Sequence, residues 1–143
     1  MTGNARFGVA VHILVMLALS DEGRKSARIA DSVDTNPVVI RRILGRLRRA
    51  DLVRAQPGPA GGFRLARPAR AITLGQVFRA VADGRPFLRP HRPNPGCAVA
   101  RGVEAALDGV GRRAERAFLG VLAGETLADA ARHARRAGAP DPA

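Results

Sequence analysis

Residues 57–62 read Pro-Gly-Pro-Ala-Gly-Gly, a run that excludes a helix, because proline lacks a backbone donor and glycine is a poor helix former. Residues 52–56 before this run and residues 63–65 after it have the composition of strands. Glycine also permits the positive φ angles of tight hairpin turns. The sequence therefore predicts a short β-hairpin with a glycine-rich tip.

Three helical segments are expected before the hairpin. Residues 7–20 form a mostly apolar helix, and residues 26–33 form a shorter helix with Ser26 as its N-cap. Asn36 is the expected N-cap of the third helix, because Pro37 then occupies the first helical position, where its missing N–H costs nothing. The apolar side chains of the third helix recur on one face, at Ile40, Ile43, Leu44 and Leu47.

Basic side chains outnumber acidic ones 24 to 12, which gives a formal net charge of +12. All of them except Lys25 are arginines, whose planar guanidinium suits phosphate oxygens and guanine edges. They are densest in residues 41–54, which form either a solvated helix face or a surface for a polyanion. Trp and Tyr are absent, so few rings can stack on unpaired bases. Duplex DNA is the expected partner.

Two short helices joined by a turn, the second of them basic outside, have the layout of a helix-turn-helix. The predicted hairpin follows the second helix directly, as in a winged helix-turn-helix. Small residues at the hairpin tip would let its backbone N–H groups approach phosphates. We therefore expect a mainly α fold with a small β-hairpin, in which residues 1–83 form a winged helix-turn-helix DNA-binding domain.

The chain continues with a helix over residues 73–83, which Thr73 caps with Gln76 at the position of a capping box. Residues 84–97 form a proline-rich loop that ends at the lone Cys97. Residues 126–136 are expected to form a weaker helix, and residues 137–143 a disordered tail.

Residues 98–122 form the longest helical candidate. A helix of this length spans about 38 Å. Because it is longer than a core of this size requires, we expect it to pair with the same helix of a second subunit; packing on its own domain is the alternative. Residues 98–136 would then be a dimerisation region, and its expected interface residues are Val99, Val103, Leu107, Val110, Ala114, Phe118 and Val121.

Several short motifs follow one another between residues 36 and 74. They are Asn36-Pro37-Val38-Val39-Ile40-Arg41-Arg42-Ile43-Leu44, Leu47, Ala50-Asp51-Leu52-Val53, Gly58, Gly61-Gly62-Phe63-Arg64-Leu65 and Ile72-Thr73-Leu74. With an apolar helix near the start and a cysteine before the long helix, they resemble the Rrf2 family of bacterial transcription regulators over residues 6–125. Its members include iron–sulfur assembly, nitric-oxide-sensing and cysteine-metabolism repressors.

This resemblance implies a homodimeric repressor on a near-palindromic operator. Each subunit would place its third helix in a major groove and its wing in a minor groove of double-stranded DNA. The candidate DNA-binding residues are Ser26, Thr35, Asn36, Val38, Val39, Arg41, Arg42 and Arg46 from the helices and Gly58, Ala60, Gly61, Gly62 and Arg64 from the wing.

Two positions depart from the family's pattern. Many members have arginine just before the wing glycine, whereas this chain has Pro57, so we expect the third helix to carry more of the base readout. Cluster-binding members use three cysteines before the long helix, whereas Cys97 is the single cysteine here. We therefore expect no cofactor, neither an iron–sulfur cluster nor another metal site.

Cys97 is a candidate redox sensor. It lies at the expected start of the long helix, where the helix dipole and unpaired N–H groups favour a thiolate, and His91, Arg92 and Arg101 are close in sequence. Oxidation, or a bridge between two subunits, would alter the dimer. An inert residue is the alternative. An oxidant or a small molecule is accordingly the expected kind of effector.

Other classes of protein are less compatible with the sequence. No stretch is as long and apolar as a transmembrane helix and no signal peptide is evident, so we expect a soluble cytoplasmic protein without a membrane partner. Catalytic motifs are not found, so an enzyme is not expected. The alternatives that remain are an architectural protein that binds DNA or RNA without sequence preference and an adaptor without nucleic acid.

Overall fold

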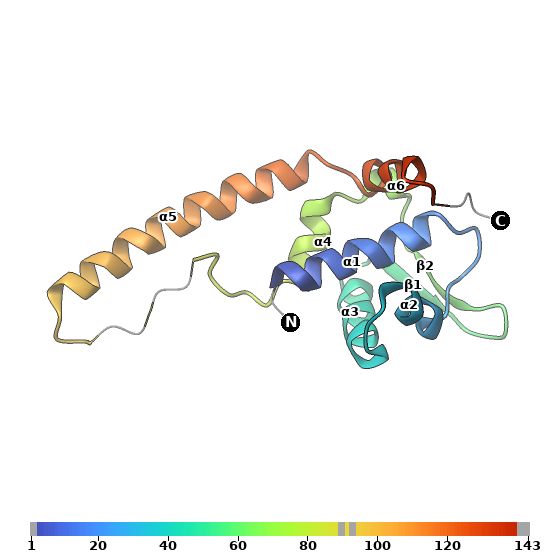
Figure 1. The fold of residues 1–143 in the computed structure, drawn as a ribbon, viewed down its shortest axis with the longest axis horizontal. Helices are drawn as coiled ribbons and strands as arrows, with labels where there is room; N and C mark the ends of the chain where they lie inside the picture. Colours follow the sequence, from blue (N-terminus) through green and yellow to red (C-terminus); the bar gives the residue numbers. More distant parts are fainter. Residues whose placement is uncertain (1–2, 89–90, 92–93, 140–143) are drawn as a thin grey trace.

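The computed structural model of the chain describes residues 3–88, 91 and 94–139. Figure 1 shows a body made of short helices and a hairpin, from which the long α5 extends to one side. The predicted mainly α fold with a small β-hairpin is confirmed. The elements are α1 (Gly3–Ala18), α2 (Ser26–Val33), α3 (Pro37–Arg49), β1 (Val53–Gln56), β2 (Gly62–Leu65), the 3-10 turn η1 (Ala69–Ala71), α4 (Leu74–Val81), α5 (Ala98–Ala123) and α6 (Leu127–Arg136).

The core lies between α1 and the helices α2, α3, α4 and α6. The apolar face predicted for the third helix is confirmed, because its four members are all buried. Charged and polar side chains are kept out of this core throughout the described residues. None of the described helices combines the length and the hydropathy needed to cross a membrane. The largest fully buried side chains include Ile13 and Leu14 of α1, Ile29 of α2, Ile40 and Leu47 of α3, and Leu127 of α6.

The start of each helix depends on local signals, and one of these was interpreted wrongly. Asn36 caps α3 as predicted, since its Oδ1 accepts the Val38 backbone N–H at 2.8 Å, and Pro37 is the first helical residue. Ser26, in contrast, is not an N-cap. It is the first residue of α2, and the N-cap is Lys25, whose side chain makes no capping hydrogen bond. The first helix also begins and ends earlier than the predicted 7–20.

The hairpin pairs β1 with β2 in antiparallel register, with Val53 opposite Leu65 and Gln56 opposite Gly62. The tip of the hairpin requires glycine, because a side chain there would clash with the backbone of the same turn. A Cβ on Gly61 would lie 2.1 Å from the backbone carbonyl oxygen of Gln56, far inside van der Waals contact. The predicted glycine-rich turn is therefore confirmed, and the close approach of its two backbone segments explains it.

The connection between α1 and α2 forms a further backbone pairing with the hairpin. The Arg24 N–H donates to the Phe63 carbonyl at 3.0 Å, and the Phe63 N–H donates back to the Arg24 carbonyl at 2.8 Å. Gly62 makes room for this pairing, because it has a φ of 138° and a Cβ there would lie 2.7 Å from the Arg24 backbone. Strand β2 is thus held between β1 and the α1–α2 connection.

Capping boxes begin both α4 and α6. Thr73 Oγ1 accepts the Gln76 N–H at 3.2 Å, and the Gln76 side chain accepts the Thr73 N–H at 3.0 Å, as predicted. Thr126 and Asp129 make the equivalent pair at α6. The two caps form one backbone bridge between Thr73 and Thr126, so the C-terminal helix is anchored beside the start of α4 and packs on α1.

The inner half of α5 is fastened to the body by aromatic rings. The Phe118 ring packs on Phe78 of α4 with ring centroids 5.0 Å apart and on Phe87 at 5.5 Å, and Phe78 packs in turn on Phe7. The Phe118 ring therefore packs within its own chain, and its place in a dimer interface stays a prediction. The packing of this turn also leaves Ala114 half-buried.

The first three residues of the predicted tail are ordered. The backbone N–H groups of residues 137–139 each donate to a carbonyl of α6, at 3.0 to 3.1 Å, so this part continues the end of the helix and is not disordered. Residues 140–143 of the predicted tail, and residues 89, 90, 92 and 93 of the predicted loop, lie outside the described residues.

Candidate nucleic-acid interface

The first two turns of α3 present an exposed apolar side chain followed by two arginines. Val38 is 46% exposed although it is apolar, and Arg41 and Arg42 are exposed on the same part of the helix. The Asn36 cap and Pro37 fix where this helix begins and hence where these side chains point. The N-terminal turns of a recognition helix are the part that reaches base edges.

Two candidates of α3 lie on its inner side. Val39 is half-buried and packs against the core. The Arg46 guanidinium donates to the carbonyl oxygens of Val81 at 2.9 Å and Ala82 at 3.4 Å, at the end of α4. Carbonyls at the end of a helix have no partner within the helix. Val39 thus contributes to the core and Arg46 joins α3 to α4, while contact of either side chain with DNA stays a prediction.

The start of α2 and the turn before α3 carry the remaining helical candidates. Ser26 and Thr35 are both half-buried, and Asn36 is exposed with its Oδ1 occupied by the cap. These positions lie at the N-terminal ends of two helices, whose unpaired backbone N–H groups attract phosphate.

The hairpin tip exposes backbone more than side chains. Gly58, with a φ of 100°, and Ala60 are exposed, Gly61 is buried beneath them and Gly62 is half-buried. Pro57 precedes this turn and has neither charge nor a donor. The tip is narrow and offers mainly peptide groups to a partner.

Arg64 of β2 is turned toward the protein. Its Nε donates to Gln56 Oε1 at 2.9 Å, and one of its terminal nitrogens donates to the Asp21 carbonyl at 2.6 Å. The Arg64 guanidinium therefore holds the hairpin to the α1–α2 connection, and its contact with DNA stays a prediction. Arg54, which lies opposite Arg64 in the register of the hairpin, is exposed.

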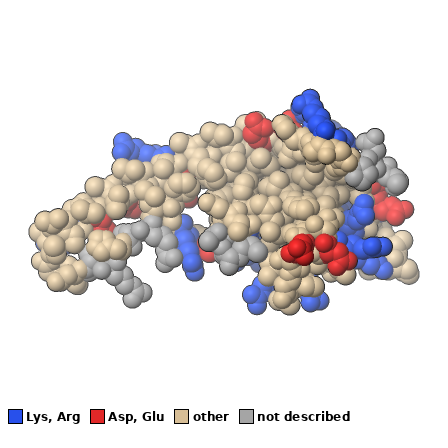
Figure 2. Space-filling model, viewed as in Figure 1, with Lys and Arg blue, Asp and Glu red and all other residues tan. Residues whose placement is uncertain are grey.

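Positive charge gathers around these elements. Figure 2 shows Lys and Arg side chains on both sides of the lower end of α3 and more of them toward the hairpin, with acidic side chains between. The surface is therefore mixed in sign, and its net positive character comes from the arginines of α3 and the hairpin.

A protein-family model for Rrf2, described as an iron-dependent transcriptional regulator, matches residues 4–133. The chain belongs to the Rrf2 family. YwnA of Bacillus subtilis, named as an HTH-type transcriptional regulator, is 39% identical over 131 residues, which cover 91% of this chain and 97% of YwnA. Rv1287 of Mycobacterium tuberculosis, named in the same way, is 33% identical over 133 residues, or 92% of this chain and 81% of Rv1287.

A solved structure supports the same assignment. The crystal structure of a protein described as DNA-binding matches with a TM-score of 0.71 and 37% sequence identity, and the match covers 87% of this chain and 97% of that chain. The Rrf2 chain is therefore a DNA-binding transcriptional regulator with a winged helix-turn-helix and is not an enzyme.

The iron in the Rrf2 family description does not fit the donor groups of this chain. The sequence has a single cysteine, Cys97, which is exposed. Within the described ranges, His, Cys, Asp and Glu side chains form no group of three or more that is placed to hold a metal ion. Iron–sulfur clusters are held by several thiolates. One chain of this Rrf2 protein therefore does not supply the ligands of such a cluster.

Cys97 lies at the N-cap of α5, as predicted. Its Sγ accepts the Ala100 N–H at 3.5 Å, and the thiol is exposed. Arg101 points back to the loop, where it donates to the Pro95 carbonyl at 2.8 Å, and His91 is exposed. Arg92 lies outside the described residues.

The helix α5 of this Rrf2 protein carries a row of exposed apolar side chains. Its members are between 39% and 75% exposed, although they are valine and leucine. Exposed apolar rows of this kind mark interaction surfaces. We call this row the α5 stripe; it consists of Val99, Val103, Leu107, Val110 and Val121.

Two arginines have structural roles that the sequence did not predict. Arg24 pairs with β2 through its backbone, and Arg6 of α1 donates to the Val81 carbonyl at 2.9 Å and forms an ion pair with Asp83 at 3.4 Å. Burial opposes ionisation of Asp83, but a backbone hydrogen bond and the charges of Arg6 and Arg85 outweigh it and lower its pKa. Arg6 and its partners Val81 and Asp83 lie far apart in sequence, so no local sequence pattern predicts these contacts.

Proposed function

We propose that this Rrf2 protein is a homodimeric repressor that binds a near-palindromic operator. Each subunit places α3 in a major groove and the hairpin tip in the neighbouring minor groove. The observation that carries the proposal is the exposed start of α3, where Val38, Arg41 and Arg42 extend beyond a cap and a proline that fix their position.

Base readout is assigned mainly to α3. Arginine forms bidentate hydrogen bonds with guanine, and an apolar side chain such as Val38 contacts the thymine methyl group. The hairpin tip, with Pro57 and exposed Gly58, contributes backbone contacts to phosphate and carries little sequence information. Its small cross-section supports entry into a minor groove.

The homodimer is supported by the α5 stripe. A helix of 26 residues is about 39 Å long, and the stripe runs from Val99 at its start to Val121 near its end. Pairing with the same helix of a second copy removes these side chains from water and places two α3 helices in a two-fold arrangement. Two-fold symmetry in the protein corresponds to inverted symmetry in the operator.

Footprinting upstream of the protein's own gene tests this function. The expected result is a protected region made of two symmetric half-sites, with transcription from that promoter reduced when protein is added. Protection that spreads along any duplex and disappears with added salt would instead favour an architectural protein without sequence preference. Two symmetric half-sites with increased transcription would overturn the repressor assignment alone.

We also assign a redox role to Cys97. Two such thiols, one from each subunit, are oxidised by one peroxide molecule to a disulfide, with release of two water molecules. The exposed position at the N-cap of α5 supports this, because the thiol lies at the end of the proposed dimerisation helix. Operator binding by the wild-type protein should change after mild peroxide, and Cys97→Ser should abolish the response. An equal response in both proteins would contradict the role.

A further inference from the structure

A pocket of about 580 Å³ lies between α1, α2 and α6, away from the exposed start of α3. Its size falls in the range of small-molecule sites, which are mostly apolar with a few polar groups. The space exists because the side chains of α6 at this point are short: Ala130 and Ala134 face α1 across the gap. The wall on α1 is formed by Val11, Val15 and Leu19.

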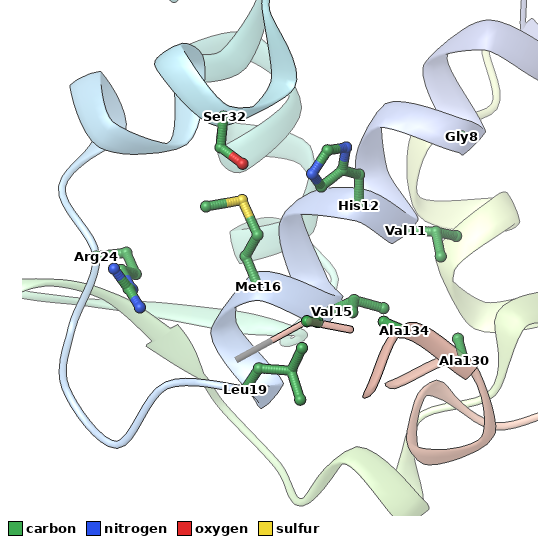
Figure 3. A pocket seen from close by; sticks show the side chains of 11 residues that line it. Gly8, Val11, His12, Val15, Met16, Leu19, Arg24, Ser32, Ala130 and Ala134 are labelled. Carbon is green, nitrogen blue, oxygen red and sulfur yellow. The ribbon is translucent and has the colours of Figure 1, made fainter. Parts of the chain in front are cut away.

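The polar groups of this pocket are gathered on one side. Figure 3 shows Ser32 of α2, His12 of α1 and Arg24 of the α1–α2 connection on the side of α2, and Ala130 and Ala134 on the side of α6. All three polar side chains can donate hydrogen bonds, and Arg24 is always charged. None of the described lining residues is Asp or Glu. The pocket is therefore apolar on one side and positive on the other.

We propose that this pocket binds a small amphipathic organic anion, with its apolar part between α1 and α6 and its acidic group at Arg24, His12 and Ser32. Met16 lies between the two sides, and its flexible thioether adapts to ligands of different shape. A carboxylate suits this end of the pocket, since a guanidinium binds it through two parallel hydrogen bonds.

The pocket is connected to the DNA-binding elements through Arg24. The side chain of this residue lines the pocket, while its backbone exchanges two hydrogen bonds with Phe63 of β2. Ser32 lies on α2, the first helix of the helix-turn-helix. A ligand that draws Arg24 toward its acidic group therefore acts on the position of the hairpin. This regulatory part rests on the proposed function, whereas the binding site itself does not.

The test is calorimetric titration of the full chain with octanoate and with 1-octanol, which have the same chain length and differ in charge. Octanoate should bind the wild type more tightly than 1-octanol does. Arg24→Met should weaken octanoate binding about tenfold and leave 1-octanol unchanged, because it removes one charge-assisted interaction. Arg28→Met, which removes an exposed arginine of α2 outside the pocket, is the matched control and should change neither titration.

Ala134→Leu should weaken both probes, because the longer side chain fills the apolar side; its thermal unfolding is measured to show that it folds. No binding of either probe at millimolar concentration overturns the site. Equal effects of Arg24→Met and Arg28→Met on octanoate binding also overturn the site. The same holds if both probes still bind the Ala134→Leu variant, because the probes then bind elsewhere, for example at the α5 stripe. Because these titrations contain no DNA, their result is independent of the operator. If octanoate binds the pocket and leaves DNA affinity unchanged, the regulatory connection is wrong.

Discussion

The arginines of α3 have two different roles, which depend on the face of the helix that each occupies. Arg41 and Arg42 are exposed, whereas Arg46 donates to carbonyl oxygens at the end of α4. A guanidinium has five donors and no acceptor, so it satisfies unpaired helix carbonyls as well as it binds phosphate. The same residue type therefore supports the fold at Arg46 and is free to meet a partner at Arg41 and Arg42, where we propose DNA recognition.

Arg42→Ala should lower affinity for the operator by about 1 to 3 kcal/mol and relax specificity at one base pair if Arg42 reads a base. If it contacts phosphate, the slope of log affinity against log salt should instead fall by about one. Fluorescence anisotropy at two salt concentrations separates these results. Arg116→Ala, on the exposed surface of α5, serves as the control, and identical behaviour of the two variants would remove Arg42 from the interface.

Arg46→Met should lower the free energy of unfolding by about 1 kcal/mol, because the Val81 carbonyl then keeps Arg6 but loses Arg46, and the Ala82 carbonyl loses Arg46 as well. Urea denaturation measures this. Arg48→Met, at an exposed position of the same helix, should leave the stability unchanged. A loss of DNA affinity in Arg46→Met at unchanged stability would show that the original prediction of a DNA contact was correct.

At the level of helices and strands, local signals were predictable and long-range ones were not. The Asn36 cap and the capping box at Thr73 were predicted, because a cap involves residues within one turn. The intramolecular partners of Arg64 and Phe118 were not predicted, because these partners come from other elements. Periodicity places a residue on a face of a helix or strand, but tertiary packing decides what that face meets.

Asp129→Ala should lower the melting temperature at neutral pH, because Asp129 completes the capping box of α6. Hydrogen bonds from the Thr126 backbone and hydroxyl, followed by Arg132, lower the pKa of Asp129. A carboxyl whose pKa is lower in the folded state stabilises the fold above its unfolded pKa, which is about 4, and this stabilisation is lost as the pH falls through the folded value.

Thermal unfolding of Asp129→Ala across acidic and neutral pH measures this dependence. The difference in melting temperature between wild type and variant should therefore shrink as the pH is lowered below about 4. Glu104→Ala, which removes an exposed carboxylate of α5, is the control. A difference that stays constant with pH would contradict the role of the Asp129 carboxylate.

For the molecule as a whole, the main division is between the helical body and α5, which extends beyond that body. The aromatic cluster around Phe118 holds one half of α5 to the body, while the side chains of the α5 stripe are left exposed. The sequence predicted this helix and all five residues of its stripe, but not that Phe118 would pack on rings of its own chain. The arrangement gives a DNA-binding body and an exposed apolar row, which we propose as the surface for a second copy.

Val103→Asp should convert the protein from dimer to monomer in sedimentation equilibrium, because a two-fold interface would bury two such carboxylates near each other. The stripe residue is exposed in the single chain, so its fold should be unaffected. Glu104→Ala is the control on the same turn. A wild-type protein that is monomeric at every concentration would contradict the dimer.

Selection of bound duplexes from a random library tests sequence-specific recognition by the α3 pair most directly. The account predicts enrichment of an inverted repeat whose half-sites lie one helical turn, or a multiple of it, apart, at about 10 base pairs per turn. The enriched duplex should bind at least about 10³-fold more tightly than bulk DNA. A pool without a consensus, in which affinity depends only on duplex length and salt, would contradict it.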